Sequence, residues 1–145
     1  MRRGLTADSG AGDSVIPRRM INAKRIRPSP GQKRGLHYVS CTDHRIPNEG
    51  EIDLEFTTVE GNDESWVVQV AEVNKPLLCI ADRVDDRCRV IFDQDDETGE
   101  DLTCIINKKT GTKNMLRRIG KVWVLDAIVR ADMISNNESD FIRPR

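Results

Sequence analysis

The segment LTADSGAGDSVIP (residues 5–17), near the N-terminus, contains a carboxylate in a setting where it could take part in acid–base chemistry. Asp8 follows a short apolar stretch, and Ser9, Gly10 and Ala11 come directly after it. A carboxylate held in such a loop can act as a general acid or base, and a glycine lets the backbone turn tightly beside it. Asp, Ser and Gly are also common turn residues, so this tripeptide taken alone favours an ordinary surface turn. The surrounding secondary structure is needed to decide between a catalytic loop and a surface turn.

The rest of the chain, which holds this loop in place, is predicted to form short strands in one domain. Only six of the 145 residues are Phe, Trp or Tyr, so the core has to rest on Val, Ile and Leu, which favour β-structure. Turn-forming residues recur about every eight to twelve positions, and no helical periodicity persists. This pattern predicts an all-β fold, a small, partly closed β-barrel.

The segment 51–70 carries the clearest strand pattern, because Ile52, Leu54 and Phe56 alternate with acidic residues and a turn sequence, EGND, precedes a second apolar run. It predicts a long hairpin. Further strands are expected at residues 5–7, 14–16, 36–41, 77–80, 89–92, 102–107, 113–116 and 122–125. The connecting segments are predicted as an exposed loop (22–35), a short helical turn (81–86), an acidic loop (93–101), a helical or frayed stretch after Asp126 and a disordered tail (129–145).

The charge of the chain is unevenly distributed. The net charge is +7 over residues 1–45, −13 over residues 46–102 and +5 over residues 103–145. Basic ends could suit nucleic acid, but no aromatic residues interleave the basic run as a base-stacking surface requires. The pattern instead favours attraction between the basic ends and the acidic middle, and nucleic acid is not expected as a partner.

The four cysteines are predicted to be buried free thiols in a reducing compartment, since they form no C-x-x-C pair and neither histidine lies at metal-ligand spacing from them. They are Cys41, Cys79, Cys88 and Cys104. No apolar run is long enough to span a membrane, and the sequence has no signal-peptide pattern. We therefore expect no membrane association and an intracellular, cytoplasmic protein.

The string DSGAGDSVIP resembles the active-site loop of retropepsin-like aspartic proteases, the protease domains of retrotransposon and retroviral polyproteins. Asp8, Ser9, Gly10 and Ala11 match the family pattern residue by residue, and residues 14–16 match the strand that follows. The later segments RIPNEGEIDLEF and VNKPLL resemble, in the same order, the body of such domains in retrotransposon-type polyproteins. The segment INKKTGTKNMLRRIGKVWVLDAIV resembles the segment that follows the protease core in those sequences. The resemblance covers about residues 5–128.

This resemblance implies a retropepsin-like domain over residues 1–128, with one lobe in each chain. It implies an aspartic endopeptidase that acts on a polypeptide substrate as a homodimer, because one Asp-Ser-Gly loop per chain calls for a two-fold pair. Asp8 would be the catalytic residue, with Ser9, Gly10 and Ala11 shaping its loop. No metal or organic cofactor is implied, since a carboxylate pair can activate water unaided.

The resemblance also implies that residues 38–46 form a flap, with Thr42, Asp43 and His44 near its tip. Three features depart from the family pattern. Few residues precede Asp8, so a truncated N-terminal strand is expected; the family's apolar-apolar-Gly motif is here Leu77-Leu78-Cys79; and no glycine lies between Gly35 and Gly50.

Two alternatives of other classes remain open. The first is a catalytically inactive relic or domesticated β domain that binds peptides or proteins, which the three departures would suit. The second is a regulatory segment, since D-S-G followed by Ser14 loosely resembles a phosphodegron, although Asp13 occupies the position where the second phosphorylated serine is expected.

Overall fold

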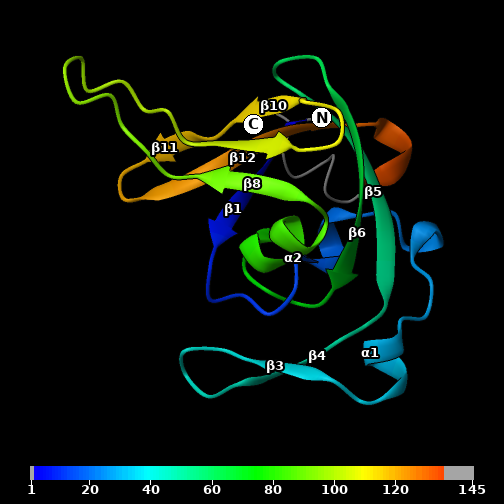
Figure 1. Ribbon diagram of the computed structural model, residues 1–145. Helices are drawn as coiled ribbons and strands as arrows, with labels where there is room; N and C mark the ends of the chain where they lie inside the picture. The colour runs from blue at the N-terminus through cyan, green and yellow to red at the C-terminus, as the bar shows by residue number, and fades with distance from the viewer. Residues whose placement is uncertain (1, 136–145) are drawn as a thin grey trace, which may run out of the picture.

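The computed structural model describes residues 2–135 and confirms the expected all-β class (Figure 1). The helices are short: α1 (Pro30–Lys33), α2 (Ile80–Asp85) and single 3-10 turns at Arg18–Met20, Ala23–Arg25 and Ala131–Met133. The strands are β1 (Arg2–Asp8), β2 (Val15–Ile16), β3 (His37–Val39), β4 (Arg45–Pro47), β5 (Glu51–Thr58), β6 (Asp63–Val70), β7 (Leu77–Cys79), β8 (Cys88–Ile91), β9 (Cys104–Asn107), β10 (Lys113–Met115), β11 (Arg117–Ile119) and β12 (Val122–Val129).

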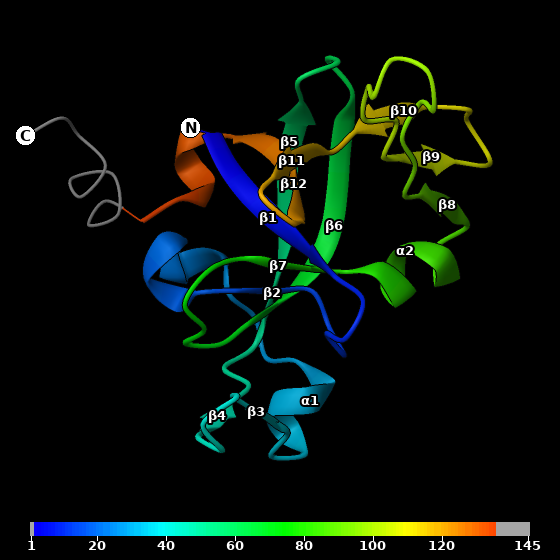
Figure 2. The same cartoon turned by 90° about the vertical axis from the view of Figure 1, so that its left-hand side faces the viewer.

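The main sheet closes on itself. Its strand order is β1-β7-β2-β6-β5-β12-β11, and β1 also pairs with β12, so the first six strands form a ring and β11 lies at an edge. A separate sheet, β10-β9-β8, lies at one end of the molecule, and the β3–β4 hairpin projects with α1 from the other end (Figures 1 and 2).

The predicted hairpin over 51–70 is confirmed as β5 and β6, and it supplies much of the core. Ile52, Leu54 and Phe56 are buried while Asp53 on the opposite face is exposed, as the alternation predicts. Leu54 pairs with Trp66 across the two strands, and the rings of Phe56 and Trp66 meet edge to face at 4.9 Å. Such aromatic contacts stabilise a pair beyond the apolar area they bury.

The strand before Asp8 is longer than the predicted residues 5–7. β1 pairs antiparallel with β12 from Arg2 to Thr6 and parallel with β7 from Thr6 to Asp8. Leu5 is 1% exposed, so β1 crosses the core. Asp8 is thereby fixed at the end of a strand that is held on both sides.

Two predicted irregular segments are more ordered than expected. The expected loop over 22–35 contains α1 and a 3-10 turn, because Asn22 and Ser29 cap them with side-chain hydrogen bonds. The helical or frayed stretch expected directly after Asp126 is wrong as far as Val129, where β12 ends, and a 3-10 turn follows at Ala131–Met133. The disordered tail predicted over residues 129–145 is wrong for residues 129–135, which include the buried Met133 and Ile134. The rest of that predicted tail lies outside the described residues.

Most other local predictions are confirmed. The apolar run 77–80 forms β7 and leads into α2, and the KKTG turn joins β9 to β10. Residues 93–101 form an acidic loop that is closed by an isolated bridge between Gln94 and Asp101. No helix among residues 2–135 is both long and apolar enough to cross a membrane.

Candidate active site

Asp8 is the last residue of β1, at the point where the chain leaves the sheet. Its loop is a tight turn, in which the Ala11 amide donates to the Asp8 carbonyl at 3.3 Å and the Gly10 amide donates to Asp8 Oδ1 at 2.8 Å. A Cβ on Gly10 would lie 3.3 Å from that carboxylate oxygen, so the glycine permits a close approach. Asp8 is partly exposed, and Ser9 and Gly10 are exposed. Within residues 2–135, Asp8 Oδ2 has no hydrogen-bond partner.

The far end of the loop is anchored in the core. Ser14 is 3% exposed; its hydroxyl accepts the Cys79 amide at 2.9 Å, and its own amide donates to Asp82 Oδ2 at 3.3 Å. A kinase cannot reach this hydroxyl in the folded chain, so Ser14 cannot serve as the second serine of a phosphodegron unless the loop unfolds, whereas Ser9 is exposed. Cys79 stands opposite Asp8 in the β1–β7 register and is fully buried, so the strand packs behind the loop without the glycine of the family pattern.

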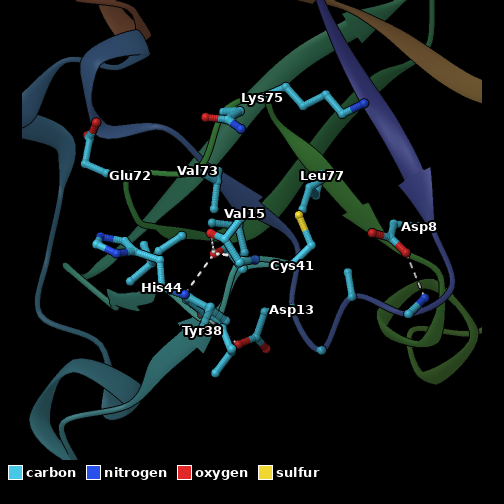
Figure 3. A pocket seen from close by; sticks show the side chains of 18 residues that line it. Asp8, Asp13, Val15, Tyr38, Cys41, His44, Glu72, Val73, Lys75 and Leu77 are labelled. Atoms are coloured by element: carbon cyan, nitrogen blue, oxygen red, sulfur yellow. Dashed lines mark hydrogen bonds between the residues drawn. The ribbon is translucent and has the colours of Figure 1, made fainter.

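An open groove of about 710 Å³ borders this loop (Figure 3). Three segments line it: the Asp8 loop with the start of β2, the β3–β4 hairpin, and residues 72–77, which run into the first residue of β7. Val15, Val73 and Leu77 give it apolar surface, and Asp8 lies on the opposite side of the view from Tyr38 and His44. The groove is therefore formed by segments that are distant in the sequence.

The expected flap is observed as a hairpin, although its role in catalysis remains a prediction. β3 and β4 pair from His37 to Pro47, and Thr42, Asp43 and His44 lie in the connecting turn. Asp43 adopts a φ of 60°, the left-handed conformation that glycine usually supplies and that Asp tolerates better than most residues. Thr42 and His44 line the groove, and both are exposed. The missing glycine is thus compatible with a hairpin turn.

A hydrogen-bonded network that sequence analysis missed ties this hairpin to the loop. The Tyr38 hydroxyl donates to Asp13 Oδ2 at 2.8 Å and accepts from Asn48 Nδ2 at 3.1 Å. Asn48 also donates to Gln69 Oε1 at 2.9 Å. Burial raises the pKa of Asp13 above its usual value, an effect that the bond from Tyr38 partly opposes, and burial raises the pKa of Tyr38 as well.

The only sequence signal for this network is the string IPNEG (residues 46–50), which contains Asn48 and Gly50. The Asn48 side chain accepts the Gly50 amide at 2.9 Å. Gly50 has a φ of +124°, and a Cβ there would lie 2.6 Å from the Arg27 carbonyl oxygen. The motif therefore encodes a tight junction between the hairpin and β5.

The remaining charged groups of the groove differ in how they are held. Glu72 forms an ion pair with Arg19 at 3.5 Å, and Arg19 also donates to the carbonyls of Val73 and Asn74. Lys75 lines the groove on the side of Asp8 (Figure 3). No group of three or more His, Cys, Asp or Glu residues in the described part of the chain is arranged to hold a metal ion.

The cysteine prediction is right for three residues and wrong for one. Cys79, Cys88 and Cys104 are buried free thiols, whereas Cys41 is exposed in the hairpin turn and lines the groove. A side chain in a turn stays exposed when no other element packs over it, and the residue type alone does not show where such a turn lies.

Comparisons of this chain with protein-family models, with curated proteins and with solved structures find no match.

Proposed function

We propose that this chain is an aspartic endopeptidase that acts as a homodimer, with the Asp8 carboxylates of two subunits paired at a two-fold axis. It would be similar to the retropepsin-like proteases of retrotransposon polyproteins. The observation that carries the proposal is the position of Asp8: it ends a buried strand beside an open groove whose other wall is a hairpin. A groove of this kind can receive an extended polypeptide.

The chemistry follows from pairing two like charges. Two carboxylates held close together cannot both ionise, so they share one proton and titrate as a pair. The ionised carboxylate removes a proton from a water molecule as that water attacks the peptide carbonyl carbon. The protonated carboxyl donates a hydrogen bond to the carbonyl oxygen and stabilises the tetrahedral intermediate. The intermediate collapses when the proton taken from water is donated to the peptide nitrogen, so that the C–N bond breaks and the nitrogen leaves as an amine.

The turn around Asp8 supports this role. The Gly10 amide fixes one carboxylate oxygen at 2.8 Å, while the other is free of partners within residues 2–135. A free oxygen is what a water molecule or a second carboxyl group would need. Exposed Ser9 and Gly10 are available to bond across the proposed two-fold axis.

The test is cleavage of a peptide library by the purified chain as a function of pH, with sedimentation of the same samples. We expect cleavage at mildly acidic pH that disappears in Asp8→Asn and persists in Asp96→Asn. The second variant makes the same charge change in the exposed acidic loop. A folded wild-type chain that binds peptides without cleaving them would refute the proposal and favour the peptide-binding alternative.

A mixing experiment tests whether the active species is a dimer. If subunits of wild type and Asp8→Asn are exchanged in equal amounts, random pairing leaves about half of the activity that the unmixed wild-type portion would have. An activity that mixing does not change would show that each chain acts by itself.

A further inference from the structure

The residue behind the Asp8 loop is a cysteine whose thiol is directed at the loop backbone. The Cys79 Sγ donates to the Ala11 carbonyl oxygen at 3.1 Å, and its side chain has no exposed surface. The Ala11 amide in turn donates to the carbonyl of Asp8. Ala11, which accepts from the thiol, is therefore hydrogen-bonded directly to the backbone of Asp8, the proposed catalytic residue.

The same residue holds the other end of the loop. Its amide donates to the Ser14 hydroxyl at 2.9 Å, so residue 79 binds the loop at Ala11 through its side chain and at Ser14 through its backbone. Two more bonds hold the Ser14 backbone: the Ser14 amide donates to an Asp82 carboxylate oxygen, and the Ser14 carbonyl accepts from the Gln69 amide. The end of the loop at Ser14 is thus clamped from three elements, whereas Ala11 depends on the thiol and on the turn itself.

Burial keeps the sulfur in the form that can donate. Loss of solvation raises the pKa of the Cys79 thiol above its usual value, so it stays protonated under ordinary conditions. A glycine at this position, as in the family pattern, would have no side chain to reach the Ala11 carbonyl. The carbonyl would then be left without this partner in a partly buried turn, which carries an energetic cost.

We propose that Cys79 is a positioning residue for Asp8, and that its thiol supports the Asp8 loop through the bond to the Ala11 carbonyl. This inference rests on the proposed function only where it concerns catalysis. The hold on the loop itself can be measured whether or not the chain cleaves peptides.

The test compares three variants of the full chain. Cys79→Ala removes the donor and nearly keeps the volume, Cys79→Ser keeps a donor, and Cys104→Ala removes a buried thiol on β9, in the other sheet. Two quantities are measured for each variant: the kinetic constants kcat and KM of peptide cleavage, and the hydrogen-exchange rates of the backbone amides of residues 9–14.

We expect exchange of the loop amides to be roughly two- to tenfold faster in Cys79→Ala, the factor that one net hydrogen bond represents. We also expect kcat to fall about tenfold with KM little changed, because a loosened catalytic group loses orientation rather than substrate binding. Cys79→Ser should stay close to wild type in both quantities. Cys104→Ala should change neither, even if it lowers stability.

The outcomes separate the two proposals. If Cys79→Ala and Cys104→Ala behave alike, or if Cys79→Ser loses as much as Cys79→Ala, the thiol does not position the loop and this inference is overturned. If the wild-type chain cleaves no peptide, the proposed function fails. Faster loop exchange in Cys79→Ala alone would then still support the thiol as the group that holds the loop.

Discussion

Replacing Asn48 by alanine should destabilise the protein strongly, because its side chain joins several segments near the groove. Asn48 is 5% exposed and uses all four of its side-chain hydrogen-bonding positions. Its Oδ1 accepts from the Ser29 hydroxyl at 2.8 Å and from the Gly50 amide at 2.9 Å. Its Nδ2 donates to Tyr38 and Gln69.

The magnitude follows from what the substitution leaves behind. Each lost bond contributes about 0.5–1.5 kcal/mol net, and a buried donor without a partner costs about 1–3 kcal/mol. Two bonds are buried, those from Ser29 and Gly50, and the other two are partly buried. We therefore expect Asn48→Ala to lower the free energy of unfolding by about 3–5 kcal/mol, since water can replace the partly buried partners and not the buried ones.

Urea unfolding followed by tryptophan fluorescence measures this loss, because Trp66 is buried in the folded chain and becomes exposed on unfolding. The control is Asn74→Ala. Asn74 is exposed, and its carbonyl rather than its side chain accepts the bond from Arg19. This variant should lie within about 0.5 kcal/mol of wild type. A loss below about 1 kcal/mol for Asn48→Ala would contradict this expectation, because the four hydrogen bonds together would then contribute no more than one bond usually does.

Two further predictions concern the same region. Gly50→Ala should lower the free energy of unfolding by about 2–5 kcal/mol, because a Cβ would lie 2.6 Å from the Arg27 carbonyl oxygen and the backbone φ is +124°. The control is Gly12→Ala, which should be nearly neutral in the same urea titration because nothing lies within 4 Å of its Cβ. Equal effects of the two substitutions would contradict the predicted clash. The raised pKa of Asp13 means that the folded state binds its proton more tightly than the unfolded state, so its stabilising contribution is complete below the usual value of 3.8 and is lost as the pH rises through the higher folded value. Asp13→Asn should therefore gain stability relative to wild type as the pH rises from about 4 to 7, and a difference that stays flat or declines would show that the sign is wrong.

The strands could be predicted largely from local patterns. The alternation in 51–58 and the apolar run at 77–80 each reflect which face of a strand is buried, and this periodicity is visible in a few neighbouring residues. α1 also has a local signal in the sequence, because Ser29 caps a helix whose first residue is Pro30. Its prediction as a loop followed from the basic, proline-rich composition of the segment.

The extent of β12 could not be predicted in this way. Asp126 interrupts an apolar run and suggests that the strand ends there, yet it is 6% exposed in the middle of β12. The Arg117 guanidinium donates to both oxygens of Asp126, at 2.9 and 3.0 Å, so the carboxylate is paired when it is buried. A buried charge depends on a partner that only the fold supplies.

Local residue patterns were enough to predict the β class, the positions of most strands and the loop in which a carboxylate could act, because each of these depends on neighbouring residue types. Long-range packing was needed to place Asp8 beside a groove, to connect the hairpin to Asp13 through Tyr38 and Asn48, and to bring the Cys79 thiol to the loop. Cys79 and Ala11 are 68 positions apart, and the parallel pairing of β1 with β7 brings them together. Hydrogen-bond partners and burial are properties of such long-range contacts, so they are decided only when the strands pair.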